Sequence, residues 1–92
     1  MKGKTAPLRR TIRLAPGYQL HADPDGSAHT LLSPKGSIQV NETAAAILDL
    51  CDGTHTREDI VGRIVRDRGE AIADDIRAFL EAAQRRGWVM EG

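Results

Sequence analysis

The sequence predicts an α+β fold in which a three-stranded antiparallel sheet is followed by three helices. Turn-forming clusters of Pro, Gly and Asp recur at short intervals as far as residue 36, and short segments with strand-like patterns lie between them. After residue 41 the apolar residues change to helical spacing. A chain of 92 residues has room for one domain with a core of its own.

Three short strands are expected in the first half, over residues 18–22, 28–32 and 37–40. The first and third alternate apolar with polar residues, which is typical of half-buried antiparallel strands. The turns beside them are marked by clusters in which Pro presets one backbone angle and Gly accepts a positive one: Pro16-Gly17, Pro24-Asp25-Gly26 and Pro34-Lys35-Gly36. Because the links are so short, a meander is the expected arrangement.

The first helix is expected to begin at Asn41, a good N-cap residue, and to end before Gly53. Its apolar residues recur at helical spacing: Ala44, Ile47, Leu48 and Cys51. Thr56 opens the second helix, with Asp59 three residues on as an approximate capping box, and Gly69 ends it.

The third helix is expected over about residues 71–86, where Gly87 follows and a short apolar tail, residues 88–90, comes after it. One face of this helix is apolar: Ile72, Ile76, Phe79, Leu80 and Ala83. Ile76 and Leu80 are expected in the core.

The charge is unevenly distributed, although the whole chain is neutral, with thirteen basic and thirteen acidic residues. Residues 1–13 carry five basic residues and no acid, so the remainder is net negative. We expect residues 1–11 to be a flexible basic N-terminal arm and residues 12–92 to be a single domain. A negative domain disfavours nucleic acid as a partner. No membrane span or secretory signal is expected, and the single Cys51 suits a reducing compartment, so the cytoplasm is the expected location.

The sequence offers little that would support catalysis, and no enzyme activity, metal or cofactor is predicted. His21 and His29 could face each other across a hairpin, but zinc needs three or four ligands. Cys51 and His55 lie on either side of a turn without a third group to orient them. No glycine-rich phosphate loop occurs.

Two binding hypotheses therefore compete. A winged-helix DNA reader would place the third helix in the DNA groove, where Asp74 and Asp75 would repel phosphates. A peptide adaptor would accept an extended segment as an extra strand on the free edge of the last strand. That edge strand comprises Ser37, Ile38, Gln39 and Val40. The apolar face of the third helix would then form the wall of a groove beside it.

Three segments carry a resemblance to a known family: Leu31-Leu32-Ser33-Pro34, Val40-Asn41-Glu42-Thr43-Ala44-Ala45-Ala46-Ile47-Leu48 and Leu50-Cys51-Asp52-Gly53-Thr54. They resemble pyrroloquinoline quinone (PQQ) biosynthesis protein D. Later pieces agree: Ile60-Val61, Asp75-Ile76, Phe79-Leu80 and Arg86-Gly87-Trp88. The resemblance spans about residues 12–90. Lys35 departs from it, because an acidic residue is expected after the proline.

The resemblance implies a winged-helix-like domain without catalytic activity or cofactor. Such a domain binds the leader of the precursor peptide PqqA as an added strand, between the third strand and the third helix. It presents the peptide to the radical S-adenosylmethionine enzyme PqqE, which crosslinks a Glu to a Tyr. An uncovered strand edge and a basic arm also favour exchange between chains, so a homodimer is considered.

Carried onto this sequence, the resemblance places the peptide on the edge strand and on one flank of the third helix. One flank presents Asp75, Phe79, Ala82 and Arg86, and the other presents Ala73, Arg77, Leu80 and Gln84. We favour the first flank, since it has an acid and a base at opposite ends with Phe79 between them. This combination suits a charged amphipathic peptide.

Overall fold

The computed structural model describes residues 10–25 and 28–92. The expected basic arm, residues 1–11, lies outside the described residues except for Arg10 and Thr11, and Thr11 is already the first residue of a strand. The predicted meander is present as an antiparallel sheet in the order β2-β3-β4: β2 (Gln19–Ala22), β3 (His29–Ser33) and β4 (Gly36–Val40). The predicted α+β class is confirmed.

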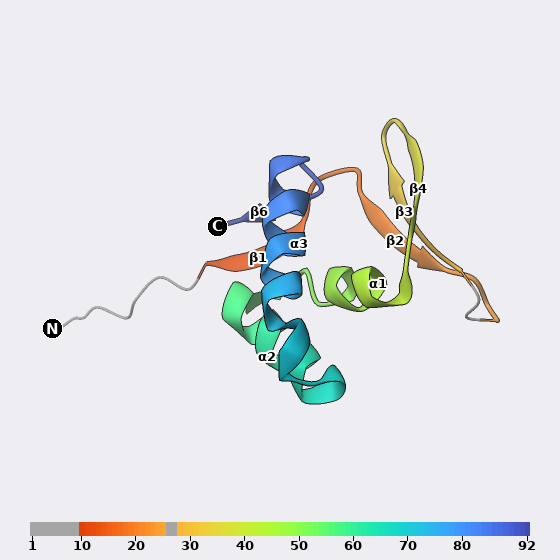
Figure 1. The fold of residues 1–92 in the computed structure, drawn as a ribbon. Helices are drawn as coiled ribbons and strands as arrows, with labels where there is room; N and C mark the ends of the chain where they lie inside the picture. Colours follow the sequence, from red (N-terminus) through yellow and green to blue (C-terminus); the bar gives the residue numbers. More distant parts are fainter. Residues whose placement is uncertain (1–9, 26–27) are drawn as a thin grey trace, which may run out of the picture.

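Three helices follow the meander: α1 (Glu42–Asp49), α2 (Arg57–Arg68) and α3 (Ala73–Arg85), with a 3-10 turn, η1 (Glu70–Ile72), leading into α3. The expected starts of α1 and α2 are confirmed by their caps. The Asn41 side chain accepts a hydrogen bond from the amide of Ala44 at 2.7 Å, and Thr56 and Asp59 form a reciprocal capping box. Figure 1 shows α1 lying between α3 on one side and the β2-β3-β4 sheet on the other.

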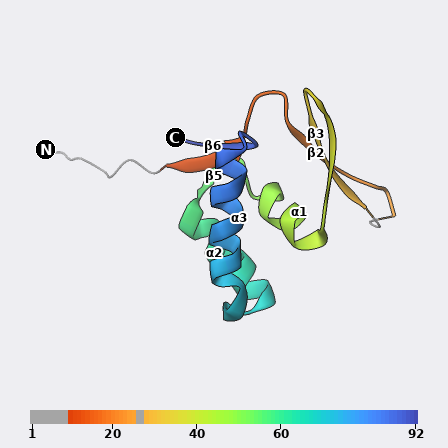
Figure 2. The same ribbon diagram turned by 45° about the horizontal axis from the view of Figure 1, so that its top comes forward.

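A second antiparallel sheet was not predicted from the sequence. Its order is β5-β1-β6, from β1 (Thr11–Leu14), β5 (Asp52–Thr56) and β6 (Val89–Glu91). Ile12 is paired with His55 on one side and with Glu91 on the other, so the sheet joins both ends of the described chain to its middle. Figure 2 shows β5 and β6 beside β1. The apolar tail expected after the third helix is therefore a strand.

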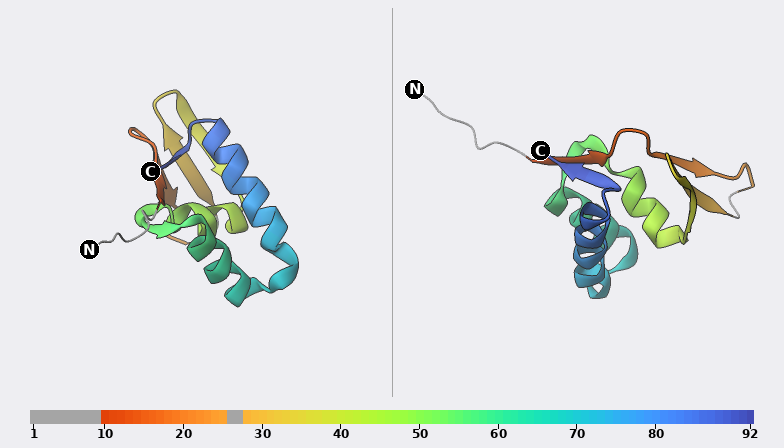
Figure 3. Two further views of the ribbon diagram at one scale, coloured as in Figure 1. Left: turned by 90° about the vertical axis from the view of Figure 1, so that its left-hand side faces the viewer. Right: turned by 90° about the horizontal axis from the view of Figure 1, so that it is seen from above.

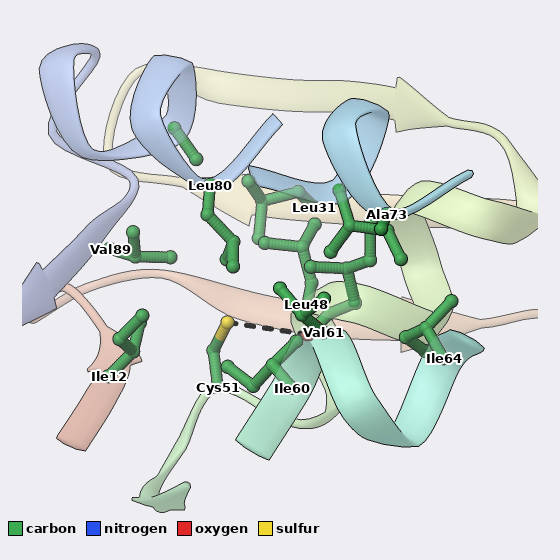
Figure 4. Close-up of a cluster of buried hydrophobic side chains, with 13 residues drawn as sticks. Ile12, Leu31, Leu48, Cys51, Ile60, Val61, Ile64, Ala73, Leu80 and Val89 are labelled. Carbon is green, nitrogen blue, oxygen red and sulfur yellow. Dashed lines mark hydrogen bonds between the residues drawn. The ribbon is translucent and has the colours of Figure 1, made fainter. Parts of the chain in front are cut away.

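The core lies where the helices pack on these two sheets. Its largest fully buried side chains come from β1, β3 and all three helices: Ile12, Leu31, Ile47, Leu48, Ile60, Ile76 and Leu80. Figure 4 shows the buried cluster to which these side chains belong. Burying each such side chain stabilises the fold by about 1.5–3 kcal/mol, so the core is the main source of stability. The expectation that Ile76 and Leu80 are core residues is confirmed.

Gly53 provides a test of backbone strain in β5, at the irregularity in its pairing with β1. Its φ is 87°, in the region that favours glycine, and a Cβ added there would meet only the Cβ of Arg13, at an ordinary 3.8 Å. Gly53→Ala should therefore lower the free energy of unfolding by about 1–2 kcal/mol through strain alone. Urea denaturation monitored by circular dichroism measures this loss.

Gly62→Ala is the matched control, because Gly62 lies inside α2 and an added Cβ would meet nothing within 4 Å. This substitution should raise the free energy of unfolding by about 0.5–1 kcal/mol. Equal effects of the two substitutions would contradict the strain argument.

Candidate functional site

Strand β4 leaves one edge of its sheet open, because it pairs with β3 alone among the described residues. Successive residues of a strand direct their backbone groups to alternate edges. The amide of Asp23 donates a hydrogen bond to the carbonyl of Ala28 at 3.0 Å across the β2–β3 hairpin. Carried through the register of the three strands, this alternation turns the backbone groups of Ser37 and Gln39 toward the open edge. These groups can accept a further strand.

The four predicted edge residues divide between the two faces of the sheet. Ile38 and Val40 are half-buried and pack against the core, whereas the side chains of Ser37 and Gln39 are exposed. Residues opposite Ile38 and Val40 on an added strand would project onto the same face as these two side chains. That face is the one covered by the helices.

A cavity of about 210 Å³ lies where the end of β4 meets α1 and α3. Its lining is mostly apolar, with polar groups among it: Asn41, Thr43, Ala44, Ile47, Ile72, Asp75, Ile76 and Phe79. Two of the predicted site residues, Asp75 and Phe79, therefore share this cavity with the residue that follows β4. Within the described residues the Asp75 carboxylate has no ion-pair or hydrogen-bond partner.

The other end of the same helix flank carries an aromatic and cationic cluster. The rings of Phe79 and Trp88 meet edge to face with centroids 6.5 Å apart, and the Arg86 guanidinium lies 5.4 Å from the centroid of the Trp88 ring. Ala82 is half-buried between the two ends. The flank thus has a carboxylate at one end, a guanidinium at the other and an apolar surface between them.

The opposite flank of α3 faces α2 and the core. Ala73 and Leu80 are buried. Arg77 forms an ion pair with Glu58 of α2 at 3.5 Å, and Gln84 accepts a hydrogen bond from Arg57 at 3.0 Å. These contacts with α2 leave the flank of Asp75, Phe79, Ala82 and Arg86 as the one directed away from that helix. In the left view of Figure 3, α3 runs on the β4 side of the sheet.

The cysteine and histidine pairs considered for chemistry do not form sites. The Cys51 thiol donates to the carbonyl of Ile47 at 3.3 Å, whereas Nδ1 of His55 lies 3.1 Å from the carbonyl oxygen of Leu50. Burial raises the pKa of Cys51 to about 12, helped by the charge of Asp52, so the thiol stays protonated near neutral pH. His21 is paired with Thr30 rather than with His29. No group of three potential metal ligands occurs among the described residues.

Asp52 holds the start of β5, directly after α1, through its own side chain. Its carboxylate accepts hydrogen bonds from the hydroxyl of Thr54 at 2.6 Å and from the amide of Thr54 at 2.9 Å, and these bonds lower the pKa of Asp52 to about 2. A carboxylate with a depressed pKa stabilises the fold above its unfolded pKa, near 3.8, and loses that effect as the pH falls toward 2. The role of this segment is structural.

The buried thiol leads to a prediction. At pH 8, native Cys51 should react with iodoacetamide far more slowly than the urea-unfolded chain. A pKa of about 12 instead of 9.0 lowers the fraction of reactive thiolate about 1,000-fold. The pKa of Cys51 is higher in the folded chain than in the unfolded chain, so the protonated thiol contributes to the free energy of unfolding. This contribution is complete below pH 9, the unfolded value, and is lost as the pH rises toward 12, the folded value. Mass spectrometry of the alkylated protein measures the rates.

His55→Ala is the control for this experiment, and it should leave the alkylation rate unchanged. A native rate equal to the unfolded rate, or one that depends on His55, would show that the thiol is activated.

Some residues of the site were missed from the sequence. Asn41 and Thr43 were considered only as part of a helix start, yet they line the cavity beside Asp75. Trp88 was considered part of a tail, yet its ring joins Phe79 and Arg86. A tryptophan directly after the end of a helix was the available signal for Trp88. No local signal marks Asn41 as a cavity residue, because its role as a helix N-cap already explains why an asparagine stands at this position.

The fold and the site define a class of small α+β domain that presents an open strand edge beside an amphipathic helix. Known proteins share this fold. Residues 28–89 match the model of the family described as Coenzyme PQQ synthesis protein D (PqqD), and the chain belongs to this family. The resemblance found in the sequence is confirmed.

Relatives of similar length support this assignment. A protein of Methylococcus capsulatus named PqqA binding protein is 38% identical over 81 residues, which are 87% of this chain and 87% of that protein. A protein of Stutzerimonas stutzeri with the same name is 43% identical over 79 residues, which are 79% of this chain and 82% of that protein.

Two solved structures share the fold. One is the solution structure of the PqqD part of Methylobacterium extorquens PqqCD, described as a functional, stand-alone recognition element for ribosomally synthesised and post-translationally modified peptides (RiPPs). Its TM-score is 0.67 at 26% identity, with 86% of this chain and 87% of that chain covered. The other, the heterocyclase TruD, has a TM-score of 0.69 at 19% identity. It covers 90% of this chain and 12% of TruD, and it shows the fold alone.

Proposed function

We propose that this protein is a peptide chaperone of PQQ biosynthesis that binds the precursor peptide PqqA as an added strand on β4. It then presents the peptide to the radical S-adenosylmethionine enzyme PqqE for the Glu–Tyr crosslink. The names of the relatives support the peptide, and the solved PqqD domain supports the recognition role. The observation that carries the proposal is the open edge of β4 beside the cavity shared by α1 and α3.

The proposed mode of binding divides affinity from specificity. The outward backbone groups of Ser37 and Gln39 hydrogen-bond to the peptide main chain, which any extended sequence can match. Alternate side chains of the peptide then lie over Ile38 and Val40 and enter the groove toward Phe79. Sequence preference comes from these side chains.

The charges on α3 suit an extended peptide of limited length. Asp75 and Arg86 are eleven residues apart on and just beyond α3, which corresponds to about 16 Å along a helix axis. About five extended residues span that length at roughly 3.3 Å each. We propose that a basic residue of the peptide lies near Asp75 and an acidic residue near Arg86, with apolar residues over Phe79 and Ala82.

The domain itself contributes binding and no chemistry in this proposal. A chaperone that holds both a peptide and its enzyme raises the effective concentration of the peptide at the enzyme, and it needs no reactive group of its own to do so. We expect this to occur in the cytoplasm. Among the described residues, no helix is long and apolar enough to cross a membrane. The competing DNA-binding hypothesis would place Asp74 and Asp75 of α3 against phosphates, and no observation favours it.

Gln39→Pro tests strand addition directly. Proline lacks the amide that would bond to the peptide, yet it is tolerated where an edge-strand amide faces solvent. The variant should fold normally and bind synthetic PqqA at least about tenfold more weakly, which corresponds to roughly 1.4 kcal/mol. Isothermal titration calorimetry gives the affinities, and the amide shifts of the labelled protein show whether the fold is intact.

Ala22→Pro is the matched control, since the same alternation turns the backbone of Ala22 toward the other open edge of the sheet. It should bind PqqA with unchanged affinity. If Gln39→Pro also binds PqqA normally, the peptide is not added to β4.

Phe79→Ala tests which flank of α3 meets the peptide. Phe79 is half-buried in the cavity wall, so its removal should weaken PqqA binding by about tenfold or more while also costing some stability through the lost contact with Trp88. Binding is therefore measured well below the unfolding temperature of the variant.

Glu81→Ala provides the comparison for this variant, because Glu81 pairs with Arg85 on the exposed side of α3. It should leave binding unchanged. A folded Phe79→Ala variant with wild-type affinity would exclude this flank.

A further inference from the structure

The sheet that carries the proposed peptide site has a second open edge, at β2. Within the described residues β2 pairs only with β3. The hydrogen bond from the Asp23 amide to Ala28 places the backbone groups of His21 and Gln19 toward β3, so those of Leu20 and Ala22 point outward. The structure therefore offers a strand-addition edge on each side of the same sheet.

A cavity of about 320 Å³ lies beside the β2 edge, between the sheet and α1. It is lined by residues of the strands β2 and β3 and of the helices α1 and α2: Leu20, Ala22, His29, Glu42, Ala45, Ala46, Asp49 and Arg68. A residue opposite Leu20 or Ala22 on an added strand would share their face of the sheet and project toward this cavity. Its floor is apolar and is formed by Ala45 and Ala46. An open edge and a hollow for side chains thus occur together here.

The rim of this cavity is net acidic. Arg68 of α2 is engaged, lying 3.4 Å from a carboxylate oxygen of Glu42 and 3.4 Å from the hydroxyl of Thr43. Within the described residues the carboxylate of Asp49 has no ion-pair or hydrogen-bond partner. Asp23 adds a further acid directly after β2. His29 is the remaining titratable group in the lining, so an incoming segment meets an acidic edge.

From these observations we infer that the β2 edge docks an extended segment of the modifying enzyme that carries apolar and basic side chains. This inference rests on the proposed function, which requires one domain to hold a peptide and an enzyme. Basic side chains match the acidic rim, and apolar ones match the floor of Ala45 and Ala46.

The two edges can be occupied at once. The cavity beside β4 is lined by Ala44 and Ile47 of α1, whereas the cavity beside β2 is lined by Ala45 and Ala46. The two cavities therefore share none of these α1 side chains. A strand added to each side of a three-stranded sheet lies four strand spacings from the other, or about 19 Å at roughly 4.8 Å each. Peptide and enzyme segment are then held on opposite edges of one rigid sheet.

A second copy of this chain is a poorer occupant of the β2 edge. Two-fold pairing of β2 strands would bring the same edge of both copies together. Each copy would then bring its own net acidic rim to the shared edge, and gathering like charges at one seam is unfavourable. A basic segment of another protein has no such conflict.

The experiment measures binding of purified PqqE and of synthetic PqqA to the full chain and to two proline variants. Ala22→Pro should weaken PqqE binding at least tenfold and leave PqqA affinity within twofold of the wild type. Gln39→Pro should show the opposite pattern. Amide spectra of both variants report whether they are folded.

Charge reversal provides a second variant in case Ala22→Pro does not fold. Asp49→Arg should weaken PqqE binding at least fivefold at low salt, and less at high salt because the attraction is screened. Asp67→Arg, an exposed reversal on α2 outside both cavities, should leave PqqE binding unchanged.

The possible failures are distinguishable. If the wild type binds PqqA but never PqqE, presentation to the enzyme fails and this inference fails with it. If PqqE binds wild type and both edge variants, Ala22→Pro and Asp49→Arg, equally well, the inference alone is overturned. A wild-type dimer that Ala22→Pro converts to a monomer, measured by light scattering, would show that a second copy occupies the edge and would also overturn it.

Discussion

Strand β1 lies between β5 and β6, and this pairing holds the helical part of the domain in one arrangement. The backbone of Ile12 is paired with a strand on each side, and its side chain is only 1% exposed, so it lies in the core. Because β5 leads directly into α2 and β6 follows α3, fixing these two strands also fixes the two helices. The groove beside β4 depends on this constraint, since α3 provides its wall.

Helix α1 is the second element on which the two proposed binding surfaces depend. It is short and rich in alanine, and its small side chains line one cavity toward α3 and another toward β2. Larger residues at these positions would fill the hollows that an added strand needs. The motif that relates the chain to its family is thus largely a scaffold: Asn41 caps the helix, Cys51 is buried beside it, and Asp52 bonds the turn.

An open strand edge offers an extended segment affinity through its backbone, but the edge alone selects no sequence. Selection has to come from what lies next to the edge. Beside β4 there are an aromatic wall and two opposite charges, and beside β2 an apolar floor and an acidic rim. Two similar edges can therefore prefer different occupants, which is what a chaperone that joins a peptide to its enzyme requires.

The sequence by itself determined the features that depend on near neighbours. The turns, the β2-β3-β4 meander and the caps at Asn41 and Thr56 follow from local backbone preferences and from side chains within a few residues. Which residues belong to the edge strand followed from the same local pattern. The tertiary structure alone decided the β5-β1-β6 sheet, because strands of three to five residues from distant parts of the chain carry too little pattern to reveal their partners. It also decided that Arg77 and Gln84 face α2 and that Asn41 meets Asp75 in one cavity. These depend on how the helices pack, and helical periodicity gives an apolar stripe without saying what covers each of its flanks.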